Sequence, residues 1–167
     1  MKFYFKYIII ISVLLSCKSS SDILPMVQQV DFSIIEVDYL GWRIYPIPDR
    51  PDYLSISYHS DDMEETTVWY NVKNHQFSPG DSVFVVKASF LLKELTSMTE
   101  SWDCKIISFV SERTEAHYYY SLEFSNNNEN YRILKTDMYE KFREAFDKPL
   151  HDGWYLRISK ASKQQPS

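Results

Sequence analysis

The sequence predicts an α+β fold in which two helices pack on one face of a mainly antiparallel sheet. Three observations support this fold class. The chain of 167 residues holds 13 Tyr and 10 Phe, which favour strands, and only three glycines. Short runs of alternating apolar and polar residues occur along most of the chain, and only two segments have helical periodicity. Because strands and helices do not alternate regularly, we expect a single domain with antiparallel pairing.

Four short strands are expected in the first half, at Phe32–Tyr39, Trp42–Ile47, Tyr53–Tyr58 and Thr66–Val72. The clearest is the third, in which apolar residues alternate with Ser55 and Ser57, as in a half-buried strand. We expect it to form a hairpin with the fourth strand across the acidic loop 61–65. An irregular loop is expected between the second and third strands, where the prolines are Pro46, Pro48 and Pro51. Proline has no amide hydrogen to donate to a neighbouring strand.

The first helix is expected over residues 83–99. Its apolar residues recur at intervals of four and three, at Phe84, Ala88, Leu91, Leu95, Met98 and Trp102. This is the spacing of one face of a helix. The β-branched residues Val83, Val85 and Val86 favour a strand instead at the start of this segment.

The second half predicts three meandering strands, a helix and a final strand. The strands are expected at Lys105–Glu112, Ala116–Phe124, Tyr131–Lys135 and Trp154–Ser159. The helix is expected over residues 137–147, because Asp137 and Glu140 have the spacing of a capping box and Pro149 ends the segment. Along the second of these strands, alternation places Tyr118, Tyr120, Leu122 and Phe124 on one face and His117, Tyr119, Ser121 and Glu123 on the other.

The N-terminus has the pattern of an export signal. Lys2 and Lys6 precede an apolar run from Tyr7 to Leu15 that only Ser12 interrupts. A helix of nine residues is only about 14 Å long, which is too short to span a bilayer, since spanning takes about 20 apolar residues. We therefore expect no transmembrane span in the mature chain.

The apolar run ends in Leu14-Leu15-Ser16-Cys17, which resembles the lipobox of bacterial lipoproteins. The resemblance covers the first seventeen residues and implies cleavage before Cys17 and acylation of that cysteine. It also implies a lipid-anchored location in the bacterial cell envelope, and Lys18 after the cysteine implies the outer membrane. The expected organisation is a signal peptide (1–16), the lipidated cysteine with a polar tether (17–30), one globular domain (31–160) and a loose polar tail (161–167).

The composition excludes several classes of function. Two of the 18 basic residues and none of the 23 acidic ones lie in residues 1–16, so the mature chain has a formal charge of −7. Nucleic acid is not an expected partner, because no basic stripe occurs. With Cys17 acylated, Cys104 is the only thiol, which excludes a disulfide framework. We interpret Cys104 as a buried hydrophobic residue.

No motif for catalysis, a cofactor or a metal occurs, and we do not expect an enzyme. The densest polar cluster is His59 with the acids Asp61, Asp62, Glu64 and Glu65. It matches no calcium loop and is interpreted as a solvated turn rather than a cation site. A second cluster, Glu112, Glu115 and His117, flanks another predicted turn and is interpreted in the same way, with acid–base chemistry as the alternative.

The aromatic surplus is the main candidate for function. If helices cover one face of the sheet, Tyr119 lies on the other, where we expect Tyr155, Trp69 and Trp42 to join it. Exposed Tyr and Trp side chains offer a large contact area at low entropic cost. The leading hypothesis is a non-catalytic envelope lipoprotein that binds another protein, as an accessory subunit or as an immunity protein against a toxin. Carbohydrate binding on the same face is the second hypothesis, and a small hydrolase is the third.

Overall fold

The structure is a computed structural model that describes residues 23–60, 63–126, 129–138, 140, 144 and 147–160, with the backbone alone at 60 and 63–65. The chain forms two compact units, residues 1–30 and 31–167. The described part of the first unit contains a short helix, α2 (Ile23–Val27), inside the segment predicted to be a tether. All the other elements belong to the second unit.

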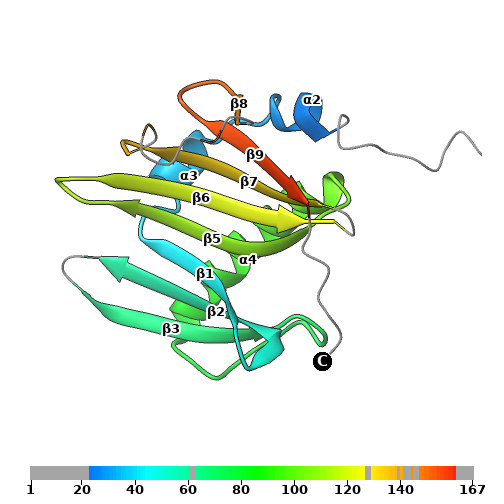
Figure 1. Cartoon of the computed structure of the whole chain (residues 1–167). Coiled ribbons are helices and arrows are strands. Elements are labelled where there is room, and N and C mark those ends of the chain that lie inside the picture. The colour runs from blue at the N-terminus through cyan, green and yellow to red at the C-terminus, as the bar shows by residue number, and fades with distance from the viewer. Residues whose placement is uncertain are drawn as a thin grey trace, which may run out of the picture. The chain divides into compact units, whose positions relative to one another are not determined.

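The second unit contains one antiparallel sheet, as the sequence predicts (Figure 1). Its nine described strands are β1 (Trp42–Ile47), β2 (Arg50–Ser60), β3 (Met63–Asn71), β4 (Gln76–Phe77), β5 (Lys105–Arg113), β6 (Tyr118–Ser125), β7 (Glu129–Thr136), β8 (Lys148–Pro149) and β9 (Tyr155–Lys160). Their order across the sheet is β4-β3-β2-β1-β5-β6-β7-β9-β8. The two edge strands, of two residues each, are too short for periodicity to reveal.

Helix α4 (Ser82–Ser101) confirms the helix predicted over 83–99. It begins where the Asp81 carboxylate accepts a hydrogen bond from the Phe84 amide at 2.8 Å. Its buried residues are Phe84, Ala88, Leu91, Leu92, Leu95 and Thr99, which largely match the predicted stripe. The valines at its start are helical because the packing of the neighbouring residues Phe84 and Ala88 in the core outweighs the weak strand preference of valine.

A second helix lies on the same side of the sheet as α4, but it is α3 (Ser33–Val37), where a strand was predicted (Figure 1). The prediction of a strand over Phe32–Tyr39 is wrong. Phe32 and Ile35 are both fully buried, and their three-residue separation places them on one side of a helix rather than on opposite faces of a strand. The Ser111 hydroxyl donates to the Ile35 carbonyl at 2.7 Å, which attaches α3 to β5.

The helix predicted over 137–147 falls largely on residues outside the described part of the chain. The Asp137 carboxylate accepts hydrogen bonds from His117 and from the Tyr118 amide, which lie at the β5–β6 turn. Asp137 therefore links the end of β7 to that turn.

The loop predicted around the three prolines is smaller than expected. Pro46 lies in β1 and Pro51 in β2, and only residues 48–49 form the turn. On the side of β1 that faces β5, the paired residues are Arg43 and Ile44, so Pro46 lies beyond the end of that pairing. On the β2 side, the register shifts directly after Pro46. Proline is tolerated here because the ladder is already irregular.

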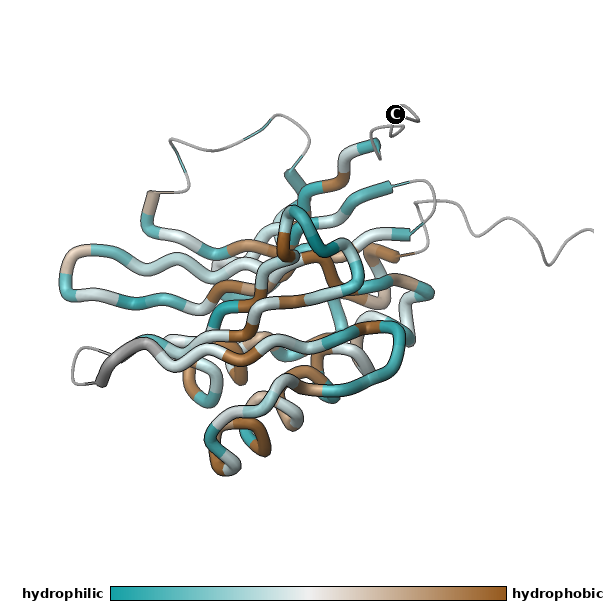
Figure 2. Tube along the Cα trace, turned by 90° about the horizontal axis from the view of Figure 1, so that it is seen from below, coloured by the Kyte–Doolittle hydropathy of each residue, from teal (hydrophilic) through white to brown (hydrophobic). Residues whose placement is uncertain are grey.

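The core lies between the sheet and the two helices. Hydropathy alternates along the strands (Figure 2). In β6 the inward set is Tyr120, Leu122 and Phe124, all buried, as the alternation predicts. Their cross-strand partners on β7 and β5 include Ile133 and Phe109, which are fully buried as well.

Candidate functional site

The sheet face that turns away from α3 and α4, called the open face, is defined by the strand register. Ile44 faces the helices and pairs with Ile56 and Phe109, so its neighbours Arg43 and Tyr45 point to the open face. Residues that are paired across neighbouring strands point to the same face, so the register assigns the side chains of every strand from β3 to β9 to one face or the other. Its side chains include Trp69, Tyr53, Ser55, Ser57, Arg43, Tyr45, Val110, Glu112, Tyr119, Ser121, Glu123, Arg132, Leu134, Tyr155 and Arg157.

Three of the four predicted binding residues share this face, and the fourth does not. Trp69 is 43% exposed, and Tyr119 and Tyr155 are partly exposed. Trp42 lies on the helix side and is only 6% exposed. Its ring stacks on Phe84 of α4, with centroids 5.1 Å apart. The expectation that Trp42 joins an exposed platform is therefore wrong, because α4 covers the position that it occupies.

The three predicted residues that share the face are far apart. Trp69 is on β3 and Tyr155 on β9, six strand positions apart in the sheet. At about 4.8 Å per strand, these positions are separated by roughly 29 Å. No small ligand contacts both rings at once. A protein interface of standard size buries about 800 Å² per partner. A patch of that area is roughly 28 Å across, which is similar to the distance between these two strands.

Sequence reasoning missed Tyr45, which is 44% exposed on the open face. Ser55 pairs with both Tyr45 and Trp69, so the two rings stand on either side of a small residue. The signal was available, since the predicted strand Trp42–Ile47 places Tyr45 opposite Trp42 and Ile44. The Arg50 guanidinium lies 5.0 Å from the Trp69 ring centroid, and this contact joins β2 to β3.

Charges on the open face are mostly paired. Arg43 and Glu112 form an ion pair at 3.1 Å, and Arg132 pairs with Glu123. Burial raises the pKa of Tyr45, and nearby Arg43 lowers it by a smaller amount, so Tyr45 is a neutral phenol at physiological pH. The exposed rings therefore lie beside neutralised charges. Trp, Tyr and Arg are the residue types most enriched at the energetic centres of protein interfaces.

The β9 end of the open face is tied to the segment before β8. Arg157 donates to both carboxylate oxygens of Asp147, at 2.9 and 3.0 Å, and also pairs with Glu144. The Asp147 side chain is 1% exposed. This buried pair fixes one end of the face.

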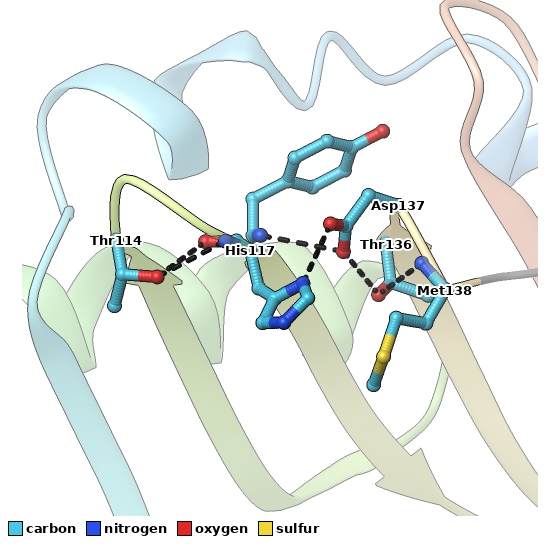
Figure 3. Close-up of polar contacts among 6 residues, drawn as sticks. Thr114, His117, Thr136, Asp137 and Met138 are labelled. Atoms are coloured by element: carbon cyan, nitrogen blue, oxygen red, sulfur yellow. Dashed lines mark hydrogen bonds and ion pairs between the residues drawn. The ribbon is translucent and has the colours of Figure 1, made fainter.

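His117 and Asp137 form a carboxylate–histidine pair, shown in Figure 3. The His117 Nδ1 and Asp137 Oδ2 are 2.9 Å apart, and the hydrogen bond from His117 is the main cause that lowers the pKa of Asp137. The Thr114 amide and hydroxyl both donate to the His117 carbonyl, and the Thr114 hydroxyl oxygen accepts from the His117 amide. Every one of these contacts closes the β5–β6 turn or joins it to β7, so the geometry supports a structural role.

The polar clusters singled out in the sequence do not assemble as catalytic sets. Glu112 pairs with Arg43 rather than with His117. Of the His59 cluster, Asp61 and Asp62 and the side chains of Glu64 and Glu65 lie outside the described residues. Within the described part of the chain, no three His, Cys, Asp or Glu side chains are grouped closely enough to hold a metal ion. Cys104 is buried, and its desolvation raises the thiol pKa to about 11.

A groove of about 860 Å³ lies between α4 and the end of α3. Its walls carry Val37 and Leu40 on one side and Val83 and Phe90 of α4 on the other. The Tyr39 hydroxyl donates to Glu94, which ties the two walls together. With Val86, one helical turn from Val83 and Phe90, the exposed residues form a set called the apolar patch: Val37, Leu40, Val83, Val86 and Phe90. Sequence reasoning missed it, because only one apolar stripe was sought on the helix.

Comparison with known proteins gave no relatives: no family model, no curated protein and no solved structure matches this chain. Among the described helices, none combines the length and the apolar character needed to cross a bilayer.

Proposed function

We propose that this protein is a non-catalytic lipoprotein of the bacterial cell envelope that binds another protein through the open face of its sheet. Cys17 lies outside the described residues, so the lipid anchor rests on the lipobox sequence. The observation that carries the binding proposal is the distribution of Trp69, Tyr45, Tyr119 and Tyr155 over one face, across a width that suits a protein interface.

Three further features support a protein as the ligand. The exposed rings stand beside arginines, a combination typical of interface hot spots. The paired charges of the face lower the cost of removing it from water. The mature chain is acidic overall, which accelerates association with a basic partner such as an envelope protein or a toxin.

The anchor is tested by counting thiols and weighing the mature protein. If Cys17 is acylated, the native protein has no reactive thiol, because Cys104 is buried, and unfolding releases one. Intact mass spectrometry should show loss of residues 1–16 and the added acyl mass. A reactive thiol in the native mature protein would show that Cys17 is not acylated.

The binding face is tested by affinity capture from solubilised envelope with the full chain as bait. We expect one stoichiometric protein that is lost with Trp69→Ala or Tyr45→Ala. The matched control is Phe90→Ala, which removes an exposed ring on the helix side. Equal recovery with all three variants would place the interface elsewhere and contradict the proposal.

Carbohydrate binding is the second candidate, because Trp69 and Tyr45 flank Ser55 on the same face and are about 10 Å apart, close enough for both rings to contact one oligosaccharide. It predicts a change in tryptophan fluorescence on titration with envelope glycans. The change should disappear with Trp69→Ala and persist with Tyr155→Ala.

A further inference from the structure

The apolar patch lies on the side of the domain where the chain arrives from the expected anchor. The chain enters the second unit at Asp31, directly before α3. Val37 ends α3 and Leu40 follows it, and both belong to the patch. Residues 17–30 join the expected anchor to Asp31 and span at most about 50 Å even when fully extended. A bilayer that holds Cys17 is therefore within reach of this part of the molecule.

The patch holds most of the large apolar side chains that are exposed in the described part of the chain. Among the described residues, eight large apolar side chains are exposed, and five of them belong to the patch. Phe90 is 64% exposed, although a ring of this size is ordinarily buried. Val83, Val86 and Phe90 are spaced by three and four residues, so they form a second apolar stripe on α4, separate from its buried face.

The charges around the groove balance. Three acids and three bases line it: Asp38, Asp81 and Glu112, and Arg43, Lys87 and Arg113. This balance gives no attraction to an anionic surface. Lys87 lies between Val83 and Phe90 on α4 and also lines the groove. A lysine at the border of an apolar surface can lay its aliphatic stem along that surface while its ammonium group stays in water or among headgroups. The patch thus suits an apolar contact with a zwitterionic interface.

We infer that the apolar patch rests on the surface of the bilayer that holds the lipid anchor, with Phe90, Val83 and Val37 inserted at headgroup level. The inference rests on the lipid anchor of the proposed function. A helix with an apolar stripe lies in the interface in this way. Five side chains bind a membrane weakly by themselves, but the anchor makes their contact intramolecular and so raises its effective concentration.

This orientation has a direct consequence for the other side of the sheet. α3 and α4 lie on one side, and Trp69 and Tyr45 project from the opposite one. When the helix side rests on the membrane, the open face turns away from the bilayer. The face proposed to bind a partner then remains accessible.

Single-site fluorescence on the lipidated full chain tests the inference. Three variants, Phe90→Cys, Val83→Cys and the control Tyr45→Cys, are labelled with a polarity-sensitive fluorophore and reconstituted in phosphatidylcholine vesicles. Buried Cys104 does not compete for the label. We expect a blue shift at positions 90 and 83 and several-fold stronger quenching there by a bilayer-embedded quencher than at position 45. The result should not change with added anionic lipid or with salt.

Each other outcome overturns the inference in a distinguishable way. Protein that stays on the vesicles with equal, aqueous emission at positions 90 and 45 would refute the patch contact and leave the anchor intact. Shielding of position 90 without vesicles, at rising protein concentration, would identify a second copy as the occupant. Shielding only after addition of envelope protein would identify a protein. Failure of the chain to stay on vesicles would refute the anchor itself.

Discussion

The helix-covered face and the open face of the sheet carry similar side chains in different surroundings. On the covered face, Trp42 is sealed between Phe84 of α4 and Tyr58. On the open face, Trp69 is almost half exposed, and the guanidinium of Arg50 lies over its ring. The surroundings of a ring, rather than its type, therefore decide whether it is buried in the core or exposed on the surface.

The two tryptophans provide the largest expected contrast. Trp42→Ala should lower the free energy of unfolding by about 3–5 kcal/mol, because it empties a core position. Trp69→Ala should lower it by less than about 1 kcal/mol, because solvent already reaches the ring. Urea denaturation of both variants checks the difference. Similar losses would mean that the open face is as well packed as the covered one.

Two ion pairs on the open face should differ in the same way. Asp147→Asn should cost about 3 kcal/mol, because it leaves the largely buried Arg157 without its closest carboxylate. Glu112→Gln breaks the more exposed pair with Arg43 and should cost at most about 1 kcal/mol. Thermal unfolding at low and high salt measures both, and only the Glu112 effect should shrink with salt. A negligible cost for Asp147→Asn would contradict the assignment of that pair as a fixed end of the face.

Two buried serines refine the comparison further. The Ser111 hydroxyl donates to the Ile35 carbonyl, whereas the buried Ser121 hydroxyl has no hydrogen-bond partner in the described part of the chain. Ser111→Ala should cost about 1 kcal/mol. Ser121→Ala should be neutral or slightly stabilising, since it removes a desolvated group without a bond. Chemical denaturation distinguishes the two, and a clear loss for Ser121→Ala would reveal a bond to that hydroxyl.

The smallest effect concerns pH. The bond from His117 holds the pKa of Asp137 below its usual value of 3.8 in the folded protein. The stabilising contribution of Asp137 is therefore present above the unfolded pKa and is lost as the pH falls through the lower, folded value. Titration of the Asp137 carboxyl by NMR should show the depressed pKa, and His117→Gln should move it upward. An unchanged pKa in that variant would remove His117 as the cause.

The sequence predicted the main helix, the antiparallel sheet and most of its strands, because alternation and helical spacing are local signals. It placed Trp69, Tyr119 and Tyr155 on one face for the same reason. It failed at α3, because in the apolar run from Phe32 to Val37 the sequence alone does not say which residues are buried. It also failed at Trp42, whose burial depends on Phe84, about forty residues away in the chain.

The apolar patch could not be predicted from the sequence. Val37 and Phe90 come together only because α3 and α4 lie on the same side of the sheet, and that arrangement depends on tertiary packing. Within α4, the sequence does not distinguish Val83 and Phe90 as exposed residues. Their exposure becomes clear only once the structure shows that the stripe containing Phe84 and Leu91 is the buried one. Pairing of distant elements, rather than local propensity, creates this surface.

Site-specific photo-crosslinking in the source cells tests the central claim most directly. A photoreactive amino acid replaces Tyr45, Tyr119 or, as a control on the helix side, Phe90, in the full chain. We expect one discrete protein to be crosslinked from positions 45 and 119 and to be absent from position 90. Crosslinks to that protein from position 90 alone, or no protein crosslink from either open-face position, would contradict the claim that the open face binds a protein.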